Sequence, residues 1–209
     1  MSIVTLERSE VSLLLVHVQC IDWTGVELPK EPELVRLENL FRLADWMELP
    51  VIATFEHPVD RNGMFPERLE ALFPSRGKRF TKRTYNCCLE PTILEAIKAL
   101  PGRQIAVAGA ETDVCIMQSV LALLKLGYDV FVLEDCLYTT EPQPRPALDR
   151  MYRSGAIPIT FKSFAYELAV SVDHSPWLDT WIERDRPYAK PFPKDFGEPE
   201  LYPDWEPKL

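Results

Sequence analysis

Cys115 is the residue of this chain whose position first suggests covalent chemistry. It lies in the stretch IAVAGAETDVCIMQSVLALLKLG, residues 105–127, which predicts a buried strand, a sharp turn and a helix. The helix is expected to begin near Asp113, with Thr112 or Asp113 as N-cap, so Cys115 falls in its first turn. Unpaired amides and the positive end of a helix dipole stabilise a thiolate, and such amides also donate to an oxyanion. The alternative is a small cysteine buried in the core.

The elements that position this cysteine follow from the hydrophobic pattern. Five short apolar runs predict strands buried on both faces: residues 12–18, 50–55, 104–109, 129–134 and 156–160. Four amphipathic segments predict helices: residues 32–48, 90–99, 113–126 and 144–154. This alternation predicts an α/β fold, a doubly wound and mainly parallel sheet of five to six strands with helices on both faces, as in Rossmann-like three-layer sandwiches. Such sheets bind ligands beyond the carboxyl ends of their strands, where Cys115 is expected.

Composition narrows the class of protein. The chain has 209 residues, 46% hydrophobic and 26% charged, as expected for an ordinary globular protein. Its net charge of −9 argues against binding to nucleic acid or to a membrane surface, since both require a basic face. The longest apolar run is shorter than the roughly 20 residues of a membrane span, and the first residues do not resemble a signal peptide, so we expect a cytoplasmic protein.

Cysteine and histidine usage argues against a metal site. The five cysteines form neither a CxxC pair nor a Cys/His zinc spacing, and only three histidines are present. We therefore expect reduced thiols, no metal and no cofactor.

Two segments stand apart from the regular pattern. Residues 57–80 predict a long polar connection, which we interpret as a lid or pocket rim. Residues 187–209 are rich in proline and aromatic residues, which favours an arm laid over the same or a neighbouring subunit, with a disordered tail as the alternative. The expected organisation is one domain over residues 1–186 followed by this arm.

The cysteine segment resembles a known family. AGAETDVCIMQSVLALLKLGYDVFVLEDC is similar to the nucleophile segment of the isochorismatase-like cysteine hydrolases. The matching residues are Gly109, Thr112, Asp113, Cys115, Gly127, Tyr128 and Asp135. The resemblance covers roughly residues 10–172 and implies that Cys115 is the nucleophile.

A second block, KRTYNCCLEPTIL at residues 82–94, resembles the lysine block of the same family. By resemblance Lys82 is the catalytic lysine and Asn86 the small polar residue that follows it. A lysine near a thiol lowers the thiol pKa and balances negative charge during acyl transfer. Without the resemblance, Lys82 would be interpreted as a solvated surface residue.

A third block departs from the family pattern. The first strand normally ends in L-L-V-I-D-V-Q, whose Asp accepts the thiol proton, whereas this chain has LLLVHVQ with His17 in that place. Gln19 is retained, and Trp23 falls near an aromatic residue that lines the pocket. Imidazole is a competent general base near neutral pH, although the neighbouring Lys82 disfavours imidazolium. We therefore assign His17 as the proton acceptor.

Other carboxylates could replace the missing Asp. Glu56 at the end of the second strand and Glu111 beside the turn are candidates, and Asp22 is a weaker one. For Glu56 and Glu111 we prefer an interpretation as charges at the pocket rim or helix start, although Glu111 could still face substrate. The resemblance also implies a cis peptide at Ala110–Glu111.

The resemblance further implies partners and assembly. Oxyanion and substrate contacts are expected from Ala110, Glu111, Thr112 and Val114, together with Gln19 and Trp23. Residues His57 and Asp60 do not reproduce the metal ligands of the nicotinamidase branch, so we predict no nicotinamidase activity. Relatives form dimers or larger assemblies, so we expect a homo-oligomer, either a dimer or a tetramer, that acts on a small molecule.

The resulting hypothesis is an amidohydrolase that cleaves a C–N or related bond through a Cys115 thioester. The alternative is a catalytically impaired family member that binds a small molecule or serves as an assembly protein, with His17 marking the lost acceptor. Vinyl-ether hydrolysis, also represented in the family, ranks last, because the acidic residue that performs the protonation is missing.

Overall fold

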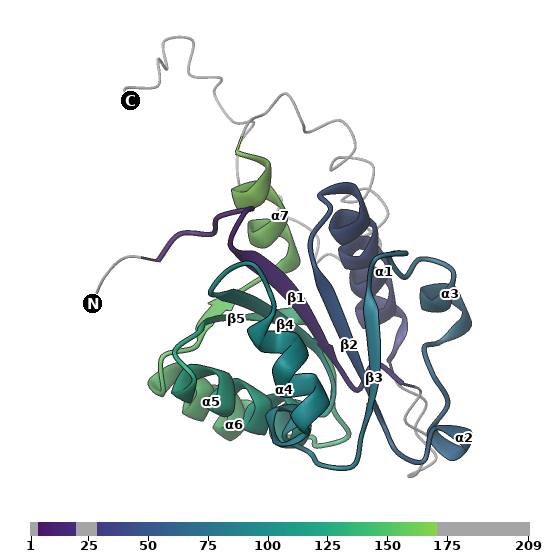
Figure 1. Cartoon of the computed structure of the whole chain (residues 1–209). Helices are drawn as coiled ribbons and strands as arrows, with labels where there is room; N and C mark the ends of the chain where they lie inside the picture. The colour runs from purple at the N-terminus through teal and green to yellow at the C-terminus, as the bar shows by residue number, and fades with distance from the viewer. Residues whose placement is uncertain (1–3, 20–28, 171–209) are drawn as a thin grey trace, which may run out of the picture.

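A six-stranded parallel sheet forms the centre of the molecule (Figure 1). The computed structural model describes residues 4–19 and 29–170. The strands are β1 Val11–Val16, β2 Val51–Glu56, β3 Lys78–Lys82, β4 Gln104–Gly109, β5 Asp129–Leu137 and β6 Ile157–Ile159. Their order across the sheet is β3-β2-β1-β4-β5-β6, and each neighbouring pair is parallel.

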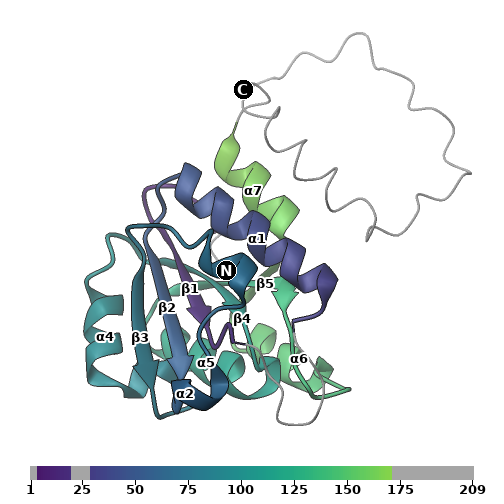
Figure 2. The same ribbon diagram turned by 90° about the vertical axis from the view of Figure 1, so that its right-hand side faces the viewer.

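Helices cover both faces of this sheet (Figure 2). The helices are α1 Glu31–Trp46, α2 Val59–Asn62, α3 Glu67–Glu70, α4 Pro91–Lys98, α5 Met117–Lys125, α6 Arg145–Arg153 and α7 Phe161–Ala169. Successive strand residues point to opposite faces, so Leu13 and Leu15 of β1 join the apolar core under α1 and α7. Leu14 and Val16 join the second core, under α4, α5 and α6. The predicted doubly wound three-layer fold is confirmed.

Most predicted elements are present, and three differences stand out. The five predicted strands correspond to β1, β2, β4, β5 and β6, but β3 lies where the sequence predicted only a connection. The predicted long loop, residues 57–80, instead contains α2, α3 and the start of β3. Helix α7 was not predicted. Across the described residues, no helix combines the length and the apolar character that crossing a membrane requires.

The strand order creates the crevice in which functional groups can meet. From β1 the chain winds outward through β2 to β3, and then returns to place β4 on the other side of β1. At such a reversal, the connections leave the two strands in opposite directions and open a space beyond their carboxyl ends. Because β1, β2, β3 and β4 are parallel, their carboxyl ends all border this space.

Candidate active site

Four chemically capable side chains come together beyond the carboxyl ends of β1 to β4. His17 directly follows β1, Glu56 is the last residue of β2, Lys82 is the last residue of β3, and Cys115 lies in the turn after β4. Glu56 and Lys82 are direct partners in the β2–β3 register, which brings their side chains to the same place. Three of these four were predicted as catalytic residues from the sequence, and Glu56 was a candidate to replace the missing Asp for which a rim charge was preferred.

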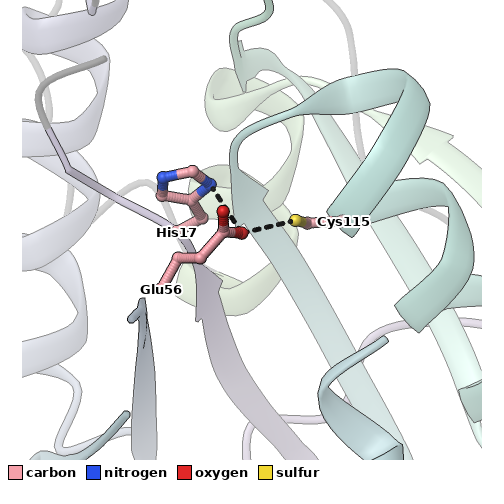
Figure 3. Close-up of side chains that lie close together, drawn as sticks. All are labelled: His17, Glu56 and Cys115. Atoms are coloured by element: carbon pink, nitrogen blue, oxygen red, sulfur yellow. Dashed lines mark hydrogen bonds and ion pairs between the residues drawn. The ribbon is translucent and has the colours of Figure 1, made fainter. Parts of the chain in front are cut away.

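The distances show one contiguous cluster. The Lys82 ammonium nitrogen lies 3.3 Å from Cys115 Sγ and 3.1 Å from Glu56 Oε2. The Cys115 thiol donates to Glu56 Oε2 over 3.4 Å. On the other side of the carboxylate, His17 Nδ1 lies 3.6 Å from the same oxygen, so Glu56 stands between His17 and Cys115 (Figure 3).

Burial controls the charge state of the cysteine. Cys115 is only 1% exposed, and this desolvation raises the pKa of its thiol to about 11. The Lys82 cation lowers the pKa of the thiol, and the Glu56 carboxylate opposes that effect. The resting sulfur is therefore a thiol near neutral pH. This differs from the thiolate expected from the helix start, because desolvation outweighs the favourable charges.

His17 is also buried, with its side chain 2% exposed. Desolvation lowers the pKa of His17 to about 4; Glu56 works against this shift and Lys82 adds to it. The backbone of His17 is left-handed, with φ of 54°, while its N–H donates to the carbonyl of Thr54 at 2.8 Å. His17 is therefore a neutral imidazole at neutral pH, held on the far side of Glu56 from the sulfur.

Comparison with known proteins identifies the family. The isochorismatase domain model matches residues 13–163. Isochorismatase domain-containing protein 2 of Xenopus laevis is 34% identical over 146 residues, which are 68% of this chain and 69% of that protein. The chain belongs to the isochorismatase family. This confirms the resemblance found in the sequence.

A bacterial protein matches this isochorismatase family member over a longer stretch. YcaC of Escherichia coli strain K12, described as a probable hydrolase, is 29% identical over 179 residues, 83% of this chain and 82% of YcaC. The crystal structure of Escherichia coli YcaC, described as an octameric hydrolase of unknown specificity, superposes with a TM-score of 0.79 and 26% identity. The superposition covers 90% of this chain and 94% of YcaC. Family membership supports a hydrolase.

The turn that carries Cys115 in this isochorismatase family member differs from the predicted helix start. Residues Thr112–Ile116 form a π-helical turn, and the regular helix α5 begins only at Met117. Cys115 is the fourth residue of that turn. Single π-helical turns are rare, and many of those that are known lie at functional sites. The implied cis peptide at Ala110–Glu111 is wrong: within the described residues, the cis bond is His57–Pro58.

Three of the amides expected to bind an oxyanion donate to backbone carbonyls in the structure. The N–H of Ala110 donates to Val16 O at 2.8 Å, that of Thr112 to Tyr138 O at 3.3 Å, and that of Val114 to Glu111 O at 3.1 Å. An oxyanion role for these three amides therefore stays a prediction, and it requires these bonds to open or to be shared.

Glu111 is held by the loop that follows β5. Its Oε2 accepts from the Thr139 hydroxyl at 2.6 Å and from the Thr140 N–H at 2.8 Å. The Glu111 carboxylate thus anchors the turn that carries Cys115 to this loop, and a direct substrate contact stays a prediction.

Metal binding can be tested against the donor set. In the part of the chain that the structure describes, one group of potential ligands is close enough, namely His17, Glu56 and Cys115, whose ligand atoms lie within 4.8 Å of one another. The Lys82 ammonium already lies within 3.3 Å of two of these groups, the Glu56 carboxylate and the Cys115 sulfur. A divalent cation there would be repelled by this buried charge, which supports the prediction of a metal-free site.

Gln19 and Trp23 were both expected to contact the substrate, and of the two the structure describes only Gln19. Gln19 lies beside the cluster and holds the backbone of Glu56 through its amide. Trp23, expected to line the pocket, lies outside the described residues, as do Asp22 and the arm at residues 187–209. Glu56 was weighed from the sequence as a replacement for the missing Asp, but a rim charge was preferred, because the pairing of β1 with β2 does not follow from spacing along the chain.

Proposed function

We propose that this protein is a hydrolase that cleaves a C–N or related acyl bond of a small molecule, with Cys115 as the nucleophile. The observation that carries the proposal is the 3.3 Å contact between a fully buried Lys82 ammonium and Cys115 Sγ. Burying a cation is costly unless it is paired, so an ammonium at 0% exposure beside a thiol is not a generic surface lysine. Its position suits the negative charge that develops when sulfur attacks a carbonyl.

The proposed reaction has two stages. Sulfur attacks the carbonyl carbon, the leaving group departs as a thioester forms, and water then releases the acid. The Lys82 charge stabilises both the anionic sulfur and the adjacent oxyanion. Chemistry of this kind needs no metal or organic cofactor.

Trapping the acyl-enzyme tests this function. The protein is incubated with p-nitrophenyl esters and small amides, quenched in acid and digested, and the Cys115 peptide is measured by mass spectrometry. We expect an acyl mass on Cys115 and turnover that Cys115→Ala abolishes. Cys136→Ala is the matched control, because Cys136 is also a buried cysteine outside any disulfide and its replacement should not affect turnover. Turnover that survives Cys115→Ala would reject the proposal.

The alternative is a binding or assembly protein without turnover. The raised pKa of Cys115 and the His17 substitution favour this alternative. It predicts stoichiometric binding of small acids or amides by calorimetry, with no acyl adduct and no product.

We also propose a homo-oligomer, because the similar YcaC is described as octameric. A dimer or tetramer was expected from the sequence, and light scattering of the full chain distinguishes these sizes from an octamer. A cytoplasmic location is proposed as well. It is supported by the four described cysteines, none of which forms a disulfide, as in a reducing compartment.

A further inference from the structure

The Glu56 carboxylate is the hub of the cluster. Its Oε2 accepts from the Cys115 thiol at 3.4 Å and from the Lys82 ammonium at 3.1 Å. A proton acceptor must lie within hydrogen-bonding reach of the proton that it removes, and Glu56 already accepts that hydrogen bond. In Figure 3 the carboxylate lies between the sulfur and the imidazole ring.

His17 is less suited to the task. Its near nitrogen, Nδ1, is 3.6 Å from Glu56 Oε2, so the carboxylate is the group between it and the thiol. Protonating the ring would place a second cation in a buried site that already holds Lys82. The lowered pKa of His17, about 4, reflects mainly its burial, with Lys82 contributing. An imidazole that holds a proton only below that pH is a weak acceptor near neutrality.

We propose that Glu56, not His17, is the catalytic residue that accepts the thiol proton and returns it to the leaving group. This inference rests on the proposed function of Cys115. In the family pattern the accepting carboxylate ends the first strand. Here it is Glu56 at the end of β2, the residue that is paired with Lys82 in the β2–β3 register.

The proton and bond changes balance over one turnover of an amide. As the S–C bond forms, the thiol proton moves to Glu56 Oε2 and the carbonyl π electrons move to oxygen. Collapse of the oxyanion breaks the C–N bond, and the departing nitrogen takes the proton from Glu56. Water then attacks the thioester and gives a proton to Glu56. When the C–S bond breaks, that proton returns to sulfur, so the products are an acid, an amine and the original thiol.

The solvent exposure of Glu56 supports its role in the second stage of the reaction, the hydrolysis of the thioester. The side chain of Glu56 is 12% exposed, compared with 0% for Lys82 and 2% for His17. Of these three, the carboxylate is the most accessible to water. The same carboxylate can therefore accept a proton from the thiol in acylation and from water in deacylation.

Glu56→Gln tests the role while keeping the shape of the side chain. With p-nitrophenyl acetate as probe, we expect steady-state turnover to fall about 100-fold. A burst of one equivalent of p-nitrophenolate should remain, because this leaving group needs no proton and because removing the carboxylate lowers the pKa of the thiol, so that the thiolate forms beside Lys82 without Glu56. Alkylation of Cys115 by iodoacetamide should become faster, because the carboxylate that raises the pKa of the thiol is gone while Lys82 remains. Faster alkylation shows that the carboxylate acts on the thiol, and the loss of steady-state turnover with the burst retained is the readout that a merely structural role would not produce.

His17→Asn is the decisive comparison, because Asn tolerates the left-handed backbone at this position. We expect its turnover to stay within about fivefold of the wild type, a small change compared with the loss of a general base. Asp60→Asn, an exposed carboxylate in α2, should leave turnover unchanged. The inference is overturned if Glu56→Gln keeps its turnover, if its alkylation is not accelerated, or if His17→Asn loses turnover about 100-fold. Turnover in Cys115→Ala would instead reject the proposed function.

Discussion

The side-chain amide of Gln19 forms two hydrogen bonds with the backbone of Glu56. Gln19 Oε1 accepts from the Glu56 N–H at 2.5 Å, and Gln19 Nε2 donates to the Glu56 carbonyl at 3.3 Å and to the Gly63 carbonyl at 2.6 Å. Beyond the end of β1, this side chain therefore continues the pairing that backbone atoms make within the sheet. It fixes the residue that carries the central carboxylate and ties it to the segment that follows α2.

Gln19→Leu should reduce both stability and turnover. Leucine has a similar size, but it leaves the buried N–H of Glu56 without its acceptor, which costs about 2 kcal/mol. Urea denaturation measures this loss, and steady-state assays should show a lower kcat as the carboxylate shifts. The control is Asn62→Ala, because Asn62 donates to the same carbonyl at 3.3 Å but is only half-buried. Equal losses in the two variants would contradict the role assigned to Gln19.

Lys82→Met should make the cysteine harder to ionise. The Lys82 cation lowers the pKa of Cys115, so its removal should raise this pKa above its value of about 11. Iodoacetamide alkylation measured across alkaline pH should show the midpoint move upward, and turnover should fall about 100-fold or more. Lys78→Met is the matched control, because Lys78 is the exposed first residue of the same strand. An unchanged alkylation profile in Lys82→Met would disprove this electrostatic coupling.

His17 should make folding stability depend on pH. Its pKa is 6.5 in the unfolded chain and about 4 in the fold, so between these values the unfolded state binds the extra proton. The contribution of His17 to the free energy of unfolding is therefore fully present above pH 6.5, and it is lost as the pH drops toward 4. At about pH 4.5 the cost is about 2.5 kcal/mol relative to about pH 7.5. The charged groups facing the ring, Glu56 and Lys82, are already included in this shift.

Urea denaturation at both pH values isolates this contribution. In His17→Asn, the difference in unfolding free energy between the two pH values should be smaller by about 2.5 kcal/mol than in the wild type. His57→Asn, which replaces an exposed histidine, should keep the wild-type difference. If the wild type and His17→Asn lose the same free energy on acidification, the ring is not buried as a neutral base.

Strands buried on both faces were predictable because their apolar runs carry the signal directly. Strand β3 was not, because it lies at the sheet edge and its residues Lys78–Lys82 are mostly polar and exposed. Its last residue, Lys82, is nevertheless fully buried. Only the family resemblance selected this residue, since neither periodicity nor composition distinguishes a buried lysine from a solvated one.

The proton acceptor was harder to predict for a different reason. Motif alignment compares positions along one strand, and His17 occupies the aligned position at the end of β1. Glu56 lies 39 residues later and reaches the same sulfur because β1 and β2 are adjacent and parallel. Knowledge of strand order, rather than of spacing along the chain, would have been needed to rank Glu56 above His17. The charge state of Cys115 likewise depended on burial, which a helix-start argument does not include.

Gly109→Ala should disrupt the approach of β4 to β1, on which the whole cluster depends. A Cβ atom at this position would lie 2.1 Å from Val16 O and 3.0 Å from Val18 Cγ2, and φ of +118° is unfavourable for any residue with a side chain. Because the clash is with backbone, we expect a loss of about 4 kcal/mol or more, or failure to fold. Gly63→Ala is the matched control: Gly63 also has a positive φ of +74°, but an added Cβ would meet nothing within 4 Å. Backbone strain alone should cost about 2 kcal/mol there. Thermal and urea denaturation distinguish the two variants, and similar losses would show that strain, rather than the contact with β1, is what requires glycine at position 109.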